Sequence, residues 1–382
     1  MATSMDLGQA CDHAATMESQ SFDVARLTVR LKAIAANYAC VRDHAGSVRT
    51  GAVVKADAYG LGAARVAPML ARTGCDTFFV ARLEEGVALR AVLPDARIFV
   101  FDGAPQSAIA ALIAHRLIPC LNSLADIAAW SDAGVRHGVL DACLHVDTGM
   151  SRLGLPADEL SVLAGEHRAR LKGINLVLVM SHLACADDAG DKMNAIQLAK
   201  FRQALAMLPP APASLAASHG TFLGPDYRFD LVRPGVALYG ANPDPNRENP
   251  MRPAAILTAK ILQLRRIDTD DPVGYGATFI AQRPSMLATI ALGYADGVPR
   301  ALSGKGFAAI AGVRVPIAGR VSMDTIILDV TDMAIPLKLG DDVEMLGDTM
   351  SLTEVAQMAD TNEYEILTRL KLRVPRYYEE VV

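Results

Sequence analysis

The sequence predicts an α/β protein: a TIM-type (β/α)8 barrel followed by a mainly β C-terminal domain. Eight short apolar runs, rich in β-branched residues, recur between residues 51 and 240. The stretches between them carry apolar residues at three- and four-residue spacing, which indicates amphipathic helices. After residue 254 the chain changes to short alternating segments separated by Gly, Pro and Asp, which is typical of antiparallel β-structure.

The predicted barrel strands are nearly continuous apolar runs, as expected for a parallel sheet that is buried on both faces. They begin at Gly51, Thr77, Arg97, Ile118, Ala142, Ile174, Ala213 and Leu231. Residues 81–93 and 194–208 are the clearest predicted helices. A doubly wound sheet is the alternative fold. It is disfavoured because no GxGxxG motif follows the first strand, and because polar residues of interest repeatedly follow strand ends.

The same patterns divide the chain into four parts. Residues 1–21 form a polar N-terminal extension, and residues 22–241 form the predicted barrel. Residues 242–254 are rich in Pro and Asn, which disfavour both helix and sheet, and are predicted to be a linker. Residues 255–382 form the mainly β C-terminal domain, with a short helix expected between Ser351 and Asp360.

Composition excludes several classes of partner. Of the 382 residues, 51% are hydrophobic and 21% charged, and the formal net charge is −5 with dispersed basic residues. This balance disfavours nucleic acids and anionic membrane surfaces as partners. No apolar stretch approaches a membrane-spanning length. The six cysteines show neither CxxC spacing nor clustering with histidine, which predicts reduced thiols and a cytoplasmic location.

The segment VVKADAYGLG, residues 53–62, places Lys55 at the end of the first predicted strand. A lysine amine that leaves an apolar strand for a Gly-rich turn is partly desolvated, which lowers its pKa and frees it to form a Schiff base with an aldehyde. The alternative is a strand-end lysine whose ammonium group reaches water. The segment alone does not decide between the two.

Other strand ends supply further polar groups that are expected to face the same mouth of the barrel. His182 and Arg233 follow predicted strands, and Ser218 and Gly235 with Val236 lie in the loops after strands seven and eight. In barrels these two loops often bind a phosphate group. A Schiff-base lysine, a phosphate site and an arginine at a ring nitrogen together indicate pyridoxal 5′-phosphate as the cofactor.

From about Phe22 onward the chain resembles the alanine racemases, which are fold-type III pyridoxal-phosphate enzymes. The matching segments, in order, are AVVKADAYGLG, HVDTGMSRLG, MSHLACAD, FDLVRPGVALYG, VGYGATF, LGYADGVPR, GRVSMD, and YEIL with RVPRYY. The resemblance implies that Lys55 holds the cofactor, that His182 flanks its ring and that Arg233 contacts the pyridine nitrogen. It also implies phosphate contacts from Tyr59, Ser218, Gly235, Val236 and Tyr364.

The resemblance further implies racemisation of L-alanine and D-alanine by two bases on opposite faces of the cofactor. Lys55 would serve the D-enantiomer, and Tyr275, contributed across a homodimer interface, would serve the L-enantiomer. Arg152 would hold the cofactor's phenolic oxygen and the substrate carboxylate, and Met323 would offer its backbone N–H to that carboxylate. The product D-alanine would supply peptidoglycan, or the reaction would serve alanine catabolism.

Three alternatives stay open from the sequence: a racemase of another small amino acid such as serine, a fold-type III decarboxylase, and a non-catalytic pyridoxal-phosphate-binding protein. Proteins of the last kind resemble the barrel alone, so the second domain with Tyr275 and Met323 favours catalysis. We expect no metal at His182, because no second ligand has suitable spacing.

Four residues depart from the pattern: His145, Asp57, Leu61 and Ala217. His145 stands where many relatives have a carbamylated lysine that orients the arginine seven residues later. We expect His145 to lie near Arg152 and to orient it without a carbamate, either as a neutral imidazole that accepts a hydrogen bond or through a bound anion.

Overall fold

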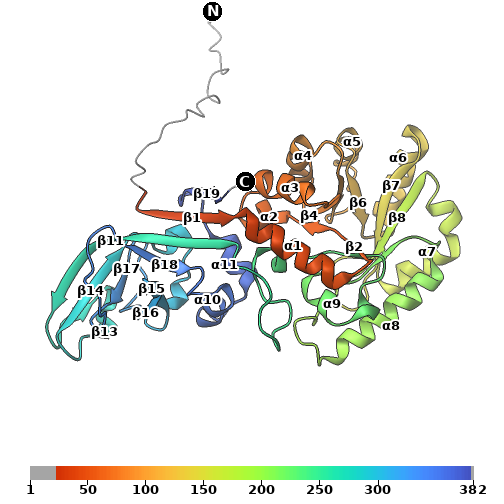
Figure 1. Cartoon of the computed structure of the whole chain (residues 1–382). Coiled ribbons are helices and arrows are strands. Elements are labelled where there is room, and N and C mark those ends of the chain that lie inside the picture. Colours follow the sequence, from red (N-terminus) through yellow and green to blue (C-terminus); the bar gives the residue numbers. More distant parts are fainter. Residues whose placement is uncertain (1–22, 380–382) are drawn as a thin grey trace, which may run out of the picture.

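A computed structural model describes residues 23–379 of the chain. The predicted extension 1–21 lies outside the described residues. The chain forms an α/β barrel and a second, mainly β part beside it, as Figure 1 shows. This confirms the fold class that the sequence predicts. Buried apolar side chains from both parts form one large core cluster, which runs from Leu27 to Val374.

The barrel is built from parallel strands, and each of the eight predicted runs contains one of them. Seven form a single sheet in chain order: β3 (Ala52–Val53), β4 (Thr77–Val80), β5 (Arg97–Val100), β6 (Ile118–Leu121), β7 (Leu140–His145), β8 (Ile174–Met180) and β9 (Ala213–Ser214). The eighth, β10 (Leu231–Val232), pairs in parallel with β2 (Arg49–Thr50), which immediately precedes the first run. On its other side, Arg233 N donates to Ala216 O at 2.9 Å, so β10 closes the barrel.

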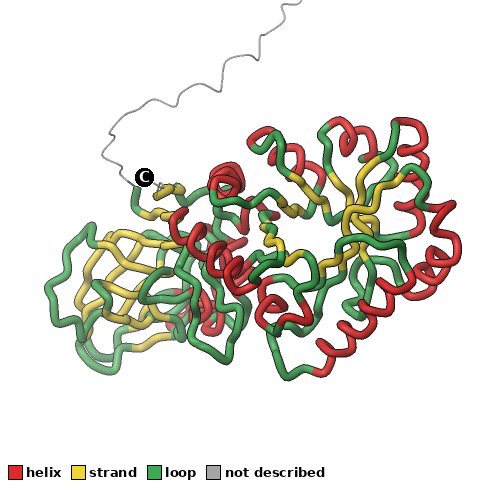
Figure 2. The backbone as a smooth tube through the Cα atoms, turned by 45° about the vertical axis from the view of Figure 1, so that its right-hand side comes forward, coloured by secondary structure: helices red, strands yellow, loops and turns green. Residues whose placement is uncertain are grey.

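Helices surround the strands, which occupy the centre of the barrel in Figure 2. They are α1 (Leu31–Ala45), α3 (Ala63–Arg72), α4 (Leu83–Val92), α5 (Ile109–Ala114), α6 (Leu124–His137), α7 (Ala157–Arg170), α8 (Lys192–Met207) and α9 (Ser218–Phe222). The two helices predicted most clearly from periodicity correspond to α4 and α8. Capping side chains mark the N-termini of two helices. Ser123 accepts a hydrogen bond from Asp126 N before α6, and Asp191 accepts one from Met193 N before α8.

The second part is an antiparallel β-structure around the long strand β11 (Ala255–Ile267). Its other strands are β12 (Pro272–Val273), β13 (Phe279–Ile280), β14 (Ser285–Ile290), β15 (Phe307–Ile310), β16 (Val313–Pro316), β17 (Ile326–Asp329) and β18 (Asp342–Leu346). Two helices follow, α10 (Leu352–Met358) and α11 (Glu363–Arg369). Short 3-10 turns occur in both parts of the chain. The barrel contains η1 (Pro225–Tyr227) and η2 (Val236–Tyr239), and the second part contains η3 (Tyr275–Ala277), η4 (Tyr294–Asp296) and η5 (Arg300–Leu302). Residues 242–254 contain neither helix nor strand.

The first strand of the described chain belongs to the C-terminal sheet and not to the barrel. β1 (Ala25–Arg30) pairs antiparallel with β11 and parallel with β19 (Arg376–Glu379), which is the last strand of the described residues. The predicted barrel range 22–241 therefore begins with a strand of the other sheet. Because β1 leads directly into α1 of the barrel, the two parts are joined covalently at both the start and the middle of the chain (Figure 1).

Candidate active site

A cavity of about 620 Å³ opens at the carboxyl ends of the barrel strands. Nine residues that the sequence and its resemblance assigned to the cofactor site all line this cavity. They are Lys55, Tyr59, Arg152, His182, Ser218, Arg233, Gly235, Val236 and Tyr364. Tyr364 comes from α11 of the second part, so both parts of the chain contribute to the cavity wall.

Lys55 follows β3 directly and begins an unusual turn. The next four residues, Ala56 to Tyr59, have φ values between 52° and 57°, so α2 (Lys55–Tyr59) contains a left-handed turn built without glycine. Each such residue costs about 1–2 kcal/mol. Two carboxylates hold the turn: Glu85 accepts from Ala56 N at 2.6 Å, and Asp57 accepts from Ala63 N at 2.7 Å.

The Lys55 amine is partly desolvated, which makes its neutral, nucleophilic form more accessible than in water. Burial is the main cause that lowers its pKa from the usual 10.5, and the positive charge of Arg152 lowers it further. Glu85 and Asp102 act in the opposite direction. The amine lies 6.0 Å from the centre of the Phe101 ring, which keeps an apolar surface next to it. The structure therefore favours the reading of Lys55 as a desolvated amine over a water-exposed ammonium.

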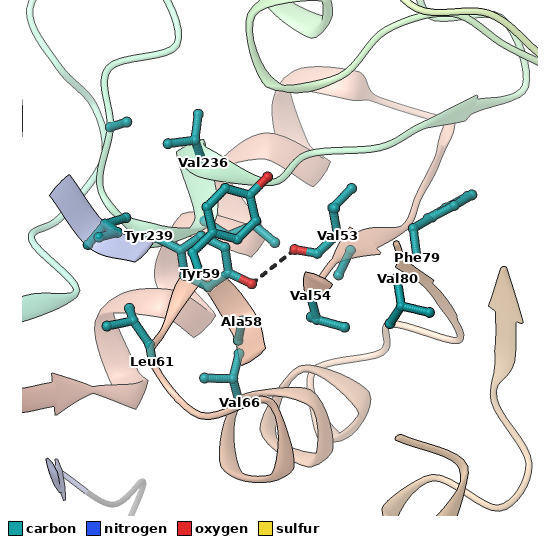
Figure 3. Close-up of a cluster of buried hydrophobic side chains, with 14 of the residues drawn as sticks. Val53, Val54, Ala58, Tyr59, Leu61, Val66, Phe79, Val80, Val236 and Tyr239 are labelled. Atoms are coloured by element: carbon teal, nitrogen blue, oxygen red, sulfur yellow. Dashed lines mark hydrogen bonds between the residues drawn. The ribbon is translucent and has the colours of Figure 1, made fainter. Parts of the chain in front are cut away.

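The left-handed turn places Tyr59 next to the loops that follow barrel strands seven and eight. Tyr59 is 4% exposed, and its ring packs against Tyr239 and Tyr364 at centroid distances of 4.7 and 5.9 Å. Figure 3 shows Tyr59 and Tyr239 together beside Val53, whose carbonyl accepts a hydrogen bond from the Tyr239 hydroxyl at 3.0 Å. Burial raises the pKa of Tyr59 far above its usual value, so its hydroxyl is a neutral donor.

Ser218 and Gly235 join the two loops. Ser218 Oγ accepts from Gly235 N at 2.9 Å and from Ala237 N at 3.2 Å. A side chain could not be added at Gly235, because its Cβ would lie 2.4 Å from the Tyr59 hydroxyl oxygen. The backbone therefore approaches the tyrosine as closely as glycine allows. Because Ser218 Oγ accepts both backbone N–H groups, its own hydroxyl proton is left to donate, and it meets the Tyr59 hydroxyl beside Gly235 at one end of the cavity, as an oxyanion site requires.

Arg233 is 1% exposed at the base of the cavity. Its guanidinium donates to Ser214 Oγ at 2.5 Å and to Ser181 O at 2.6 Å. Burial lowers its pKa to about 10, which still leaves it protonated at neutral pH. A fixed, charged group that can only donate hydrogen bonds thus faces the cavity.

His145 and His182 are both neutral, because burial lowers the pKa of each; that of His145 falls to about 4. Asn122 fixes the ring of His145. The Asn122 amide donates to Phe101 O at 2.9 Å, so its oxygen is the group that lies 2.8 Å from His145 Nδ1. Nδ1 is therefore the protonated nitrogen, and Nε2 is left as an acceptor.

Arg152 lies in an exposed loop that Asp147 shapes. The Asp147 carboxylate accepts from the backbone N–H groups of Gly149, Met150 and Ser151, at 2.9 to 3.1 Å. Within residues 23–379 no ion pair or hydrogen bond holds the Arg152 guanidinium. Arg152 and His145 both line the cavity, and the charge of Arg152 contributes to the low pKa of His145. The His145 imidazole is therefore a neutral group in the same cavity as Arg152 and not a second cation.

The chain does not bring Tyr275 and Met323 to this cavity. Tyr275 in η3 is 71% exposed and Met323 is 52% exposed, and neither belongs to the cavity wall. Both lie in the second part of the chain, in loops of the β-structure. One chain alone therefore holds the lysine but not the predicted tyrosine in its cavity.

Three supporting residues were not identified from the sequence: Asn122, Phe101 and Glu85. Asn122 and Phe101 each follow the end of a barrel strand, so the strand-end rule that selected Lys55 and His182 also applies to them. Glu85 had no comparable signal, because its role depends on the unusual turn after Lys55. It also accepts from Ala81 N at 2.8 Å and so joins two neighbouring loops.

Two features are absent from residues 23–379. No group of three or more His, Cys, Asp or Glu side chains there is arranged to hold a metal ion. No helix in this range is both long and apolar enough to cross a membrane.

Comparison with known proteins identifies the family. The model of the alanine racemase N-terminal domain matches residues 29–243, and that of the C-terminal domain matches residues 254–378. The alanine racemase of Methylobacterium nodulans is 48% identical over 95% of this chain and 98% of its own length. That of Rhodospirillum rubrum is also 48% identical, over 93% of this chain and 96% of its own.

Solved structures agree. Alanine racemase from Bartonella henselae, with covalently bound pyridoxal phosphate, aligns with a TM-score of 0.90 at 43% identity, over 93% of this chain and 99% of that one. The biosynthetic enzyme of Pseudomonas aeruginosa aligns with a TM-score of 0.87 at 35% identity, over 94% of this chain and 100% of that one. Both domain models, the curated relatives and the solved structures cover nearly the whole described chain, and the chain therefore belongs to the alanine racemase family.

Proposed function

We propose that this chain is a pyridoxal-phosphate-dependent racemase that interconverts L-alanine and D-alanine. The observation that carries the proposal is the cavity at the strand ends, where a buried lysine amine, an oxyanion site and a buried arginine occur together. Family membership supports this assignment over the length of both domains.

The residues of the cavity fit pyridoxal phosphate. The glycine at position 235 leaves room for an anion where any side chain would collide with Tyr59. Tyr59, Ser218, Val236 and Tyr364 would hold the phosphate with it, and Lys55 would bind the aldehyde carbon. When bound, the cofactor withdraws electrons from the amino acid and so acidifies its α-proton.

Arg233 would set the strength of that withdrawal. Its guanidinium stays protonated and is held by Ser214 and by the Ser181 carbonyl, so it can donate a hydrogen bond to the ring nitrogen but cannot readily give it a proton. A ring nitrogen left neutral withdraws electrons less strongly. This favours immediate return of the proton to the α-carbon over side reactions, and His182 would flank the ring on one side.

Racemisation removes the α-proton on one face and returns a proton on the other, so it needs two groups that move protons. The low pKa of the Lys55 amine suits it to take the proton of the D-enantiomer. Tyr275 would act on the L-enantiomer. Because Tyr275 is exposed and lies outside its own chain's cavity, we propose that it enters the cavity of a partner subunit in a homodimer.

Arg152 and Met323 would bind the substrate carboxylate. The exposed Arg152 guanidinium has a free fork of donors, and neutral His145 can accept one of them through Nε2 and so orient it. Met323, like Tyr275, would come from the partner subunit and offer its backbone N–H. No carbamylated lysine is needed in this arrangement.

The domain plan belongs to the same proposal: an extension at 1–21, a cofactor-binding barrel at 22–241, a linker at 242–254, and a C-terminal domain at 255–382 that carries the second base. A cytoplasmic enzyme of this kind would supply D-alanine for peptidoglycan or serve alanine catabolism. Racemisation of serine is the second candidate, since the same contacts would accept another small side chain. A decarboxylase is disfavoured because Arg152 would retain the carboxylate.

Two signals, measured in the same reaction, test the proposal. Purified protein with pyridoxal phosphate is incubated with each L-amino acid in deuterated water, while α-proton exchange and optical rotation are recorded. We expect exchange and loss of rotation together, fastest with alanine. Exchange without formation of the other enantiomer would reject the two-base scheme, and absence of both with alanine would reject the function.

The variant Tyr275→Phe tests the second base separately. It should retain the absorbance of the bound cofactor and lose about two orders of magnitude or more in turnover, because general acid–base groups contribute that much. Tyr227→Phe, in η1 and outside the cavity wall, is the matched control and should racemise normally. An unchanged rate in Tyr275→Phe would show that the assignment is wrong.

A further inference from the structure

A second cavity, of about 400 Å³, lies at the opposite end of the barrel from the candidate active site. It is bounded by the amino ends of β5, β6 and β7, at Arg97, Ile118 and Leu140. Its wall includes three arginines, Arg90, Arg97 and Arg116, and two aspartates, Asp95 and Asp141. Neither the racemase mechanism nor the strand-end rule for barrels assigns a role to this cavity.

Arg90 is a structural member of this wall. Its guanidinium donates to the carbonyls of two loops, 93–96 and 115–116, at 2.7 to 3.0 Å. These bonds use most of its donors and fix the rim of the cavity. The pKa of Arg90 is lowered, first by burial and then by the charge of Arg116, so a positive charge in this rim is not fully neutralised.

Arg97 and Arg116 provide the free donors. The Arg97 guanidinium stacks over the Phe99 ring at 5.4 Å, and no hydrogen bond or ion pair holds it in the described part of the chain. Arg116 donates one bond, to Pro94 O at 2.7 Å, and is otherwise exposed. Its φ of 49° is a conformation that glycine adopts at lower cost, yet an arginine stands there.

The aspartates of the wall do not cancel these charges. Asp141 accepts from Asn175 Nδ2 at 2.7 Å, and within residues 23–379 neither Asp95 nor Asp141 forms an ion pair with the arginines. The remaining wall is mostly apolar and includes Ile113, Val139 and Leu140, with the 1% exposed Trp130 packed behind them. A cavity of this size that combines guanidinium groups with apolar side chains has the properties of a small-molecule site.

We propose that this cavity binds a small anion that carries a phosphate or carboxylate group, held by Arg97 and Arg116 with its carbon body against Ile113 and Leu140. Arg97 is oriented in advance by a stack of rings: Phe99 lies 4.8 Å from Phe79, and Phe79 lies 5.6 Å from Phe101. Phe101 is the ring beside the Lys55 amine. The same stack of aromatic rings therefore connects the proposed anion site with the candidate active site.

Trp130 offers a direct probe, because it is the only tryptophan of the chain and lies in the cavity wall. Its fluorescence is titrated in the holoenzyme, where the cofactor occupies the other anion site, with inorganic phosphate in one series and succinate in another. Sodium chloride keeps the ionic strength constant. We expect a saturable change with at least one of the two, and the series that responds identifies the preferred group.

Arg97→Gln and Arg116→Gln should each weaken this binding roughly tenfold or more, since each removes charge-assisted hydrogen bonds. Arg116 is exposed, so its variant tests the site even if Arg97→Gln fails to fold. Arg168→Gln, on the exposed face of α7 and outside the cavity, is the matched control and should bind as the parent does. No saturable change with either anion, or equal binding in Arg116→Gln, would overturn the proposal.

Discussion

At the scale of single residues, Gly235 shows how tightly the candidate phosphate site is built. Gly235→Ala would place a methyl group 2.4 Å from the Tyr59 hydroxyl oxygen and force the tyrosine or the loop to move. Overpacking of this kind costs about 1–3 kcal/mol, so we expect roughly ten- to hundredfold weaker binding of pyridoxal phosphate. Absorbance titration of the apoprotein measures this.

Gly165→Ala is the matched control for that substitution. Gly165 lies in α7, and nothing lies within 4 Å of where its Cβ would be. An alanine there should leave cofactor affinity unchanged and slightly stabilise the helix. Equal affinity in both variants would show that close approach at position 235 is unimportant for the cofactor.

His145 makes stability depend on pH in a definite direction. Its pKa is about 4 in the folded chain, because of burial, and near 6.5 when unfolded. The unfolded state therefore binds more protons between these values, and the free energy of unfolding falls as pH decreases from about 6.5 to 4, by about 3 kcal/mol from this residue. His182, whose pKa is also lowered, acts in the same direction.

Urea unfolding of the parent and of His145→Gln across this pH range measures that contribution. Glutamine cannot take up a proton, so the variant should lose less stability on acidification than the parent. Parallel curves for the two proteins would mean that folding does not lower the pKa of His145, which contradicts its burial as a neutral imidazole.

At the scale of elements, β1 couples the two ends of the chain. Leu27, in its centre, is fully buried between β11 and β19. Leu27→Ala should lower the free energy of unfolding by about 2–5 kcal/mol. The core is continuous from Leu27 to Val374, so circular dichroism of the whole chain and Trp130 fluorescence from the barrel should report the same shifted transition.

Val24→Ala is the control for that experiment, because Val24 immediately precedes β1 and is 50% exposed. It should change stability by no more than about 0.5 kcal/mol. If Leu27→Ala behaved like Val24→Ala, β1 would not be an integral strand of the C-terminal sheet.

The elements also show what sequence patterns can and cannot predict. Continuous apolar runs were sufficient to locate all eight barrel strands, because a parallel sheet buried on both faces tolerates little else. The position of β1 was not predictable in the same way. Its alternating pattern fits either sheet, and only pairing with β11 and β19, more than two hundred residues away, decides between them.

The left-handed turn after Lys55 was not predictable from the sequence either. Ala, Asp, Ala and Tyr carry no local preference for positive φ, so a sequence pattern predicts only a turn before Gly60. Tertiary contacts from Glu85, and the burial of Tyr59 against Tyr239, impose the conformation. The side chains of the site were predictable because they follow strand ends, whereas the backbone geometry that orients them was not.

At the scale of the whole molecule, the two proposed bases of one chain lie in different environments. Lys55 lines a cavity inside its own chain, while Tyr275 is exposed on the β-structure. The proposed two-base mechanism therefore requires a homodimer in which each chain gives its lysine to one site and its tyrosine to the other.

Mixing two inactive variants tests this claim most directly. Lys55→Ala and Tyr275→Phe are unfolded and refolded together with pyridoxal phosphate, and alanine racemisation is measured. A hybrid dimer would contain one site with both native residues, so random mixing should restore roughly a quarter of the parental activity. Refolding either variant alone should restore none. If the mixture stays as inactive as its components, the two bases do not come from different chains, and the shared site is refuted.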